Sequence, residues 1–145
     1  GIENDGASAT ITNLTNSGNI SAGTAISNTT GTIDTITNTG FISSLTSLAD
    51  IHNNGYINML INRQRNLTFT GNLPANYQIM IASTSNYGKI TFTGVTGTTI
   101  FDIHSTSSVM ENTTYTSVIT GISDSELSTT TGTFIDEGVI AMTGH

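Results

Sequence analysis

The residues best placed for chemistry in this sequence are Asp102 and His104, two positions apart. Side chains at i and i+2 of a β-strand share a face, so this carboxylate could orient the imidazole as a general base, or the pair could hold a metal ion. The neighbouring hydroxyl, Ser105, would point to the opposite face of the same strand. Because the pair has no nucleophile beside it, we interpret it as part of a polar outward face and predict no enzyme activity.

Other charged clusters are few. Asp124-Ser-Glu126 and Asp136-Glu137 offer oxygen ligands of the kind that calcium accepts. Neither lies in the glycine-rich Asp loop of calcium-binding solenoids, and three histidines without cysteine give no zinc spacing, so we expect no metal and no cofactor. The basic cluster Arg63-Gln-Arg65 could contact a sulfated or acidic glycan. We interpret it instead as a solvated loop between the two halves of the chain.

Threonine pairs of the form Thr-x-Thr recur along the chain. Stacked on one face of a solenoid, such pairs resemble the ice-binding surface of some β-solenoid antifreeze proteins, which needs one fixed phase per coil. The alternative is simple alternation, because Thr is both β-branched and polar. The candidate ligand face consists of Thr68, Thr70, Thr91, Thr93, Thr114 and Thr116. The four tyrosines could stack on sugars, and we expect at least half of them to pack in the core or at corners.

The composition narrows the classes of protein that could position these residues. Asp, Glu, Lys and Arg make up 9% of the 145 residues, whereas Thr, Ser and Asn supply about two residues in five. Three basic residues and a net charge of −7 argue against a phosphate-backbone binder, since that affinity is built from many Lys and Arg contacts. A hydrophobic content of 35% does not fit the charged, apolar-poor composition of disordered chains.

A repeated unit, aliphatic-x-Asn-x-Gly-x-aliphatic, is the strongest signal in the first half. Each copy reads as a short strand, a corner and another short strand, with the aliphatic side chains inward. Asn tolerates a left-handed backbone and Gly supplies a positive φ without steric cost, so we assign them to the corners. The corner residues are Asn16, Gly18, Asn38, Gly40, Asn53 and Gly55. Looser copies occur around Asn4 and Asn28.

Two successive units together have the length of about one turn of a parallel β-solenoid. An antiparallel sandwich also has short strands at this spacing. The repetition of one corner and the equal phase of the inward Ile and Leu favour the solenoid for residues 1–66.

The second half, residues 67–145, contains longer apolar strands and more aromatic residues, with Pro74 in a turn between two of them. We expect it to continue the stack with a larger core and to cap its end, because open strand edges recruit other chains. The predicted fold is therefore all-β, a right-handed parallel β-solenoid with a more hydrophobic C-terminal region, forming one continuous unit.

A family resemblance rests on the order of short motifs in this second half. Leu73-Pro74-Ala-Asn76-Tyr77-x-Ile79-x-Ile81, Tyr87-Gly88-Lys-Ile90, Phe101-Asp-Ile103 and the segment 114–123 follow one another behind the Asn-x-Gly-x-Ile repeats. This arrangement resembles certain bacterial autotransporter passenger proteins and covers roughly residues 10–132. The resemblance implies a secreted parallel β-helix displayed on the cell surface. No basic segment followed by an apolar stretch is present, so we expect no signal peptide within this sequence.

The sequence therefore predicts a non-enzymatic, extracellular surface solenoid that acts as a stalk or adhesin segment. A host or neighbouring-cell glycan or protein is the partner that this role would imply, with no nucleic acid and no membrane insertion by this segment. The alternatives are a glycan-binding or ice-binding solenoid that uses its Thr-rich face, and a phage tail-fibre segment.

Overall fold

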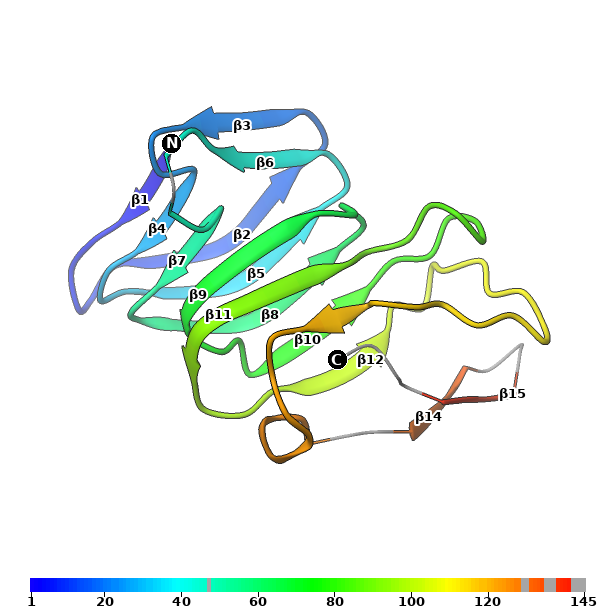
Figure 1. Cartoon of the computed structure of the whole chain (residues 1–145). Coiled ribbons are helices and arrows are strands. Elements are labelled where there is room, and N and C mark those ends of the chain that lie inside the picture. Colours follow the sequence, from blue (N-terminus) through cyan, green and yellow to red (C-terminus); the bar gives the residue numbers. More distant parts are fainter. Residues whose placement is uncertain (47, 129–130, 135–137, 142–145) are drawn as a thin grey trace.

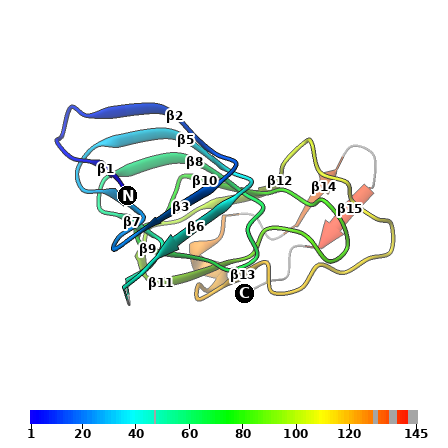
Figure 2. The same cartoon turned by 90° about the horizontal axis from the view of Figure 1, so that it is seen from above.

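The computed structural model describes residues 1–46, 48–128, 131–134 and 138–141. In this part of the chain, strands follow one another around a parallel β-solenoid of about four turns, as the sequence predicts. Figure 1 shows the coils stacked from the N-terminal end towards the later strands, and Figure 2 shows the same stack from above.

Three parallel sheets form the sides of the solenoid. The first has six strands: β1 (Ile2–Asn4), β4 (Ile26–Asn28), β7 (Ile51–Asn53), β9 (Leu67–Asn72), β11 (Ile90–Thr96) and β13 (Ile119–Thr120). The second has five: β2 (Thr10–Asn16), β5 (Thr32–Asn38), β8 (Tyr56–Asn62), β10 (Asn76–Ile79) and β12 (Ile100–Ile103). The third has only β3 (Asn19–Ala22) and β6 (Phe41–Ser44). A 3₁₀ turn, η1 (Asp124–Glu126), precedes an antiparallel pair, β14 (Thr131–Phe134) and β15 (Gly138–Ala141).

Coil length changes in the middle of the stack. Ile2 pairs with Ile26 and Ile26 with Ile51, two steps of nearly equal length, but Ile51 pairs with Phe69 after a clearly shorter step. The third coil therefore passes directly from the end of β8 to the start of β9, and it adds no strand to β3 and β6. The first two sheets continue through this point, so the strands of both halves as far as β13 share one stack, whereas β14 and β15 form a separate antiparallel sheet.

The core consists of side chains that repeat at the same place in successive coils. In the second sheet, Leu14, Ile36, Leu60, Tyr77 and Phe101 occupy matching positions and are all buried. Parallel register makes this possible, because each inward residue lies directly above its equivalent one coil earlier. Apolar side chains in the segment 109–127 join the same core: Val109, Tyr115, Val118, Ile119, Ile122 and Leu127.

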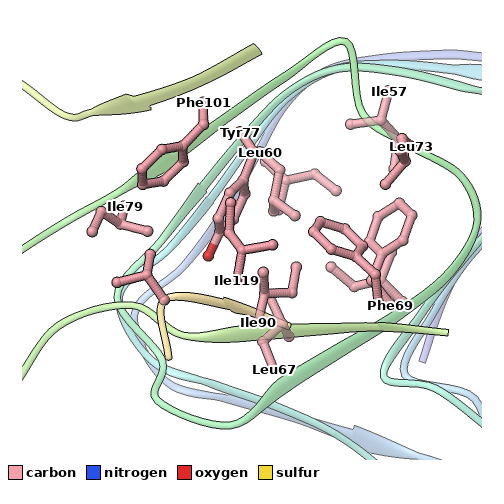
Figure 3. Close-up of a cluster of buried hydrophobic side chains, with 14 of the residues drawn as sticks. Ile57, Leu60, Leu67, Phe69, Leu73, Tyr77, Ile79, Ile90, Phe101 and Ile119 are labelled. Carbon is pink, nitrogen blue, oxygen red and sulfur yellow. The ribbon is translucent and has the colours of Figure 1, made fainter. Parts of the chain in front are cut away.

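The later coils fill the core with aromatic side chains at places where the early coils have aliphatic ones. Phe92 meets Phe69 edge-on with ring centroids 5.5 Å apart and meets Tyr77 edge-on at 6.1 Å, while Tyr77 stacks on Phe101 at 5.9 Å. Figure 3 shows Tyr77 and Phe101 beside Ile79, across from Phe69 and Leu73. Among the described residues, no helix is long and apolar enough to cross a membrane.

Candidate functional site

Two columns of buried asparagines line the corners at which strands of the first two sheets end. In the first column, Asn4 donates from Nδ2 to Asn28 Oδ1 at 2.9 Å, and Asn28 donates to Asn53 Oδ1 at 2.8 Å. Asn53 in turn donates to the Asn72 carbonyl oxygen at 2.8 Å. The amides of Asn28 and Asn53 thus accept from the coil before them and donate to the coil after them. Satisfied in this way, they connect successive coils although they are completely buried.

The second column consists of Asn16, Asn38 and Asn62. Asn16 Nδ2 donates to Asn38 Oδ1 at 3.0 Å, and Asn38 Nδ2 lies 3.3 Å from Asn62 Oδ1. The column ends on the hydroxyl of Tyr77, which accepts from Asn62 Nδ2 at 3.3 Å. Complete burial raises the pKa of Tyr77 well above its usual range, and the hydrogen bond from Asn62 acts in the opposite direction. Asn62 could not be recognised as a corner from the sequence, because no glycine follows it two positions later.

Gln64 closes the third sheet at the shortened coil. Its Oε1 accepts from the Ile42 backbone N–H at 2.9 Å, and its Nε2 donates to the Ile42 carbonyl oxygen at 3.0 Å. The side-chain amide therefore makes the two bonds that a third strand would otherwise make with β6. It also accepts from Asn38 Nδ2 at 2.9 Å, which ties this edge to the second asparagine column.

The corner glycines act differently from the sequence-based expectation. Gly18, Gly40 and Gly55 do lie where the chain turns between strands, but none of them has a positive φ. A Cβ on Gly40 would collide with the carbonyl oxygen of Gly18, and one on Gly55 with that of Gly31. Gly40 and Gly55 need to be glycine because successive coils approach too closely for a side chain. The assigned left-handed backbone is therefore wrong at these three glycines, and Asn16, Asn38 and Asn53 do not adopt it either.

The candidate threonine face is only partly assembled. Thr68 pairs with Thr91 and Thr70 with Thr93 on neighbouring strands β9 and β11. Thr114 and Thr116 are exposed in the irregular segment before β13, outside the sheet. Thr120 takes the expected place instead, with its hydroxyl oxygen 3.0 Å from that of Thr91.

The candidate catalytic pair is not brought together by a hydrogen bond. Asp102 Oδ1 accepts from the backbone N–H of Ile103 at 2.8 Å, whereas His104 Nδ1 lies 2.8 Å from Thr106 Oγ1. No group of three or more metal-ligating side chains occurs among the described residues. Glu126, in the acidic cluster at 124–126, accepts from the Ser123 backbone N–H at 3.1 Å, and Asp136-Glu137 lies outside the described residues. Three tyrosines are buried (Tyr77, Tyr87 and Tyr115), and Tyr56 is exposed.

A basic groove joins residues from several coils. It is open, has a volume of about 510 Å³, and is lined by Thr39, Gly40, Phe41, Arg63, Gln64, Arg65, Asn66, Asn86 and Lys89. These residues contain all three Lys and Arg side chains of the chain. Arg63 and Arg65 could be grouped because they are close together in the sequence, whereas Lys89 and Phe41 reach the same groove from the neighbouring coils.

Comparisons of the chain with protein-family models, with curated proteins and with solved structures give no match.

Proposed function

We propose that this chain is a non-enzymatic structural segment of an extracellular bacterial surface protein, and that it serves as a stiff stalk or adhesin segment. The observation that supports this role is the unbroken stack. The first sheet pairs coil to coil from β1 to β13 and the second from β2 to β12, while two asparagine columns connect the early coils. A segment built in this way keeps its two ends at a fixed separation.

The surface chemistry fits the same role. Charged residues are scarce, and the chain has no cysteine that could be oxidised during export. A chain of this kind can pass a secretion pore unfolded and bury its aliphatic ladders once outside. The resemblance to autotransporter passengers supports the same origin, and we include that origin in the proposal.

Surface display tests the origin. The chain is placed between a signal peptide and an outer-membrane β-barrel, and intact cells are probed with an antibody against an epitope tag at its N-terminus. We expect labelling of unpermeabilised cells and a folded, protease-resistant segment. Retention of the tag inside the cell would overturn the autotransporter origin.

The distance between the distal end of the displayed chain and the membrane tests the proposed role as a stiff stalk. A fluorophore at the distal end of the displayed chain should report one narrow distance from the membrane by energy transfer. A Gly/Ser linker of equal residue number is the control, and it should give a broad distribution because such linkers behave as random coils. Equal distributions for the two segments would overturn the structural role.

Ice binding through the threonine face has weaker support than the stalk. The Thr-x-Thr pairs in register occupy two strands, and His52 of β7 takes the position next to Thr70. We expect no thermal hysteresis from the purified chain. If the parent chain did show thermal hysteresis, and the double substitution Thr91→Tyr and Thr93→Tyr abolished it, an ice-binding role would replace the proposed stalk.

A further inference from the structure

All the fixed positive charge on the side chains of this acidic chain lies in one place. The chain carries ten carboxylates and three Lys or Arg side chains, and the three cations, Arg63, Arg65 and Lys89, all line the basic groove. No Asp or Glu side chain is among the groove residues. In a molecule with a net charge of −7, this makes the groove a local site of opposite sign.

The stack itself brings these cations together. Arg63 donates its backbone N–H to the Asn38 carbonyl oxygen of the preceding coil at 2.9 Å, and Lys89 donates to the Gln64 carbonyl oxygen at 2.9 Å. Lys89 comes a whole coil later in the sequence than Arg63, yet inter-coil pairing places the two on neighbouring levels of the same corner. The shortened third coil leaves the space in front of them, because no strand follows β6 in the third sheet.

The cations retain capacity for an outside ligand. Arg63 donates one bond from Nη2 to the Thr39 carbonyl oxygen at 3.0 Å, and Lys89 Nζ lies 5.1 Å from the ring centroid of Tyr87. Arg65 is exposed. Within the described part of the chain, none of the three is paired with a carboxylate. A guanidinium has five donors in a fork that matches a carboxylate or a sulfate, so two such groups remain available here.

The uncharged lining points to a sugar. Phe41 is 47% exposed at the edge of the groove, and an exposed ring can pack against the apolar face of a pyranose. Asn66 and Asn86 add amides, which both donate to and accept from hydroxyl groups. Polyphosphates fit less well, because a closely spaced backbone charge would be repelled by the carboxylates over the rest of the surface.

We infer that the basic groove binds an acidic polysaccharide, with its carboxylate or sulfate groups on Arg63, Arg65 and Lys89 and a sugar ring on Phe41. The groove volume of about 510 Å³ is in the range of sites that hold small ligands, so a few sugar units would contact it at once. This inference rests on the adhesin part of the proposed function and is independent of the stalk part, because affinity for a glycan and reach from a membrane are separate measurements.

Titration calorimetry on the whole chain tests the inference with four probes: oligogalacturonate for carboxylates, heparin oligosaccharide for sulfates, dextran as a neutral sugar, and single-stranded DNA as a polyphosphate. We expect at least one acidic sugar to bind with salt-sensitive affinity, dextran not to bind, and DNA to bind at least tenfold more weakly. The acidic sugar that binds identifies the acid group. Absence of binding by both acidic sugars, or equal affinity for DNA, would overturn the inference.

Variants locate the site. Arg65→Gln should weaken binding about tenfold, because it removes charge-assisted hydrogen bonds, and the triple variant Arg63→Gln, Arg65→Gln and Lys89→Gln should abolish it. Thr98→Asp is the charge control, since it lowers the net charge by one as Arg65→Gln does, at an exposed position outside the groove. Its affinity should stay within about twofold of the parent chain.

The ring has a matched control as well. Phe41→Ala should weaken binding about fivefold, whereas Tyr56→Ala removes an aromatic of similar exposure (50%) outside the groove and should leave affinity unchanged. Circular dichroism melts confirm that each variant is folded. Unchanged binding by the folded triple variant, or equal losses for the two aromatic variants, would overturn the proposed site.

Discussion

Residues 1–62 and residues 67–122 belong to the same stack but fill it with different chemistry. The early coils pair aliphatic ladders with buried amides, such as Asn28, which is completely buried and bonded on both sides. The later coils replace the amides with larger apolar groups: Ile79 and Ile103 continue the positions of Asn16, Asn38 and Asn62. One backbone plan therefore accepts either a polar column or an apolar one, and the two kinds of column meet where Asn62 pairs with Ile79.

The change from buried amides to apolar side chains also coincides with the position of the basic groove. The third sheet ends where the amide column gives way to Tyr77 and Ile79, and Gln64 completes the last bonds of that sheet. The groove thus lies at the junction between the two ways of filling a coil. Substitutions on either side of the junction can break or sharpen this comparison.

The largest loss is expected in the aromatic half. Phe92→Ala removes a buried ring that contacts both Phe69 and Tyr77, and it should lower the free energy of unfolding by about 4 kcal/mol. Ile36→Ala in the aliphatic half should cost about 3 kcal/mol, because the cavity is smaller. Urea denaturation followed by circular dichroism measures both. If Phe92→Ala were no worse than substitution of the half-exposed Ile100, the ring cluster would not be the core of this half.

The amide column should be nearly as sensitive. Asn28→Ala leaves the Asn4 amide and the carbonyl oxygens of Gly31 and Tyr56 without their bonds to Asn28, and it should cost about 3 kcal/mol. Asn13→Ala, at an exposed position on β2, is the control and should change stability by less than about 0.5 kcal/mol. Equal effects of the two substitutions in the same denaturation assay would contradict a structural role for the column.

The corner glycines offer a matched pair. Gly40→Ala places a methyl group against the backbone of Gly18 and should cost about 2 kcal/mol. Gly18 occupies the same position of the repeat but has open space around its own Cβ direction, so Gly18→Ala should be nearly neutral. Melting temperatures of the two variants give the comparison. A loss for Gly18→Ala as large as that for Gly40→Ala would mean that backbone conformation, not contact between coils, selects glycine here.

Tyr77 links the halves and should make stability depend on alkaline pH. Its pKa is raised by burial, so the unfolded chain loses this proton first and the contribution of Tyr77 to stability falls as the pH rises above about 10. Tyr77→Phe should cost about 1 kcal/mol at neutral pH through the lost bond to Asn62, and its stability should fall less as the pH is raised from neutral to beyond this value. Parallel pH profiles for the two proteins would refute this assignment.

The smallest expected effect is an increase in the free energy of unfolding. Thr99 is fully buried, and within the described residues its Oγ1 has no hydrogen-bond partner. Thr99→Val keeps the shape and removes the unpaired hydroxyl, so it should raise the unfolding free energy by about 0.5 kcal/mol in the same urea assay. Destabilisation by Thr99→Val would show that the hydroxyl has a bonded partner in solution.

The repeat was readable from the sequence because each coil is short and its inward residues recur at one phase. Ile36, Asn38 and Gly40 could be assigned to a strand end and a corner for this reason. The role of the glycines could not be assigned, since positive φ and close approach of two backbones both select glycine. Only the register between coils separates the two causes.

The groove was harder to predict because its residues come from different coils, and the register between coils decides which of them meet. Arg65 and Lys89 are separated by one full coil of sequence, so a search for basic residues at coil spacing would have found the pair. Phe41 could not be added in this way, because the third coil is shortened and the chain returns past Gln64 without forming a strand. The threonine face failed at Thr114 for a related reason: the coil that leads from Ile90 to its partner Ile119 is longer than the coils before it, so the threonine in register is Thr120.

The glycine contacts also give the stack a direction. Four glycines lie so close to the backbone of the preceding coil that a Cβ would collide with it: Gly40, Gly55, Gly71 and Gly88. A side chain added at one of these corners would therefore push apart a single seam and leave the contact with the following coil intact. Each such substitution would therefore weaken the contact between one chosen pair of coils. Two fragments of the solenoid divided at that contact should reassociate when the glycine is present and stay separate when it is replaced.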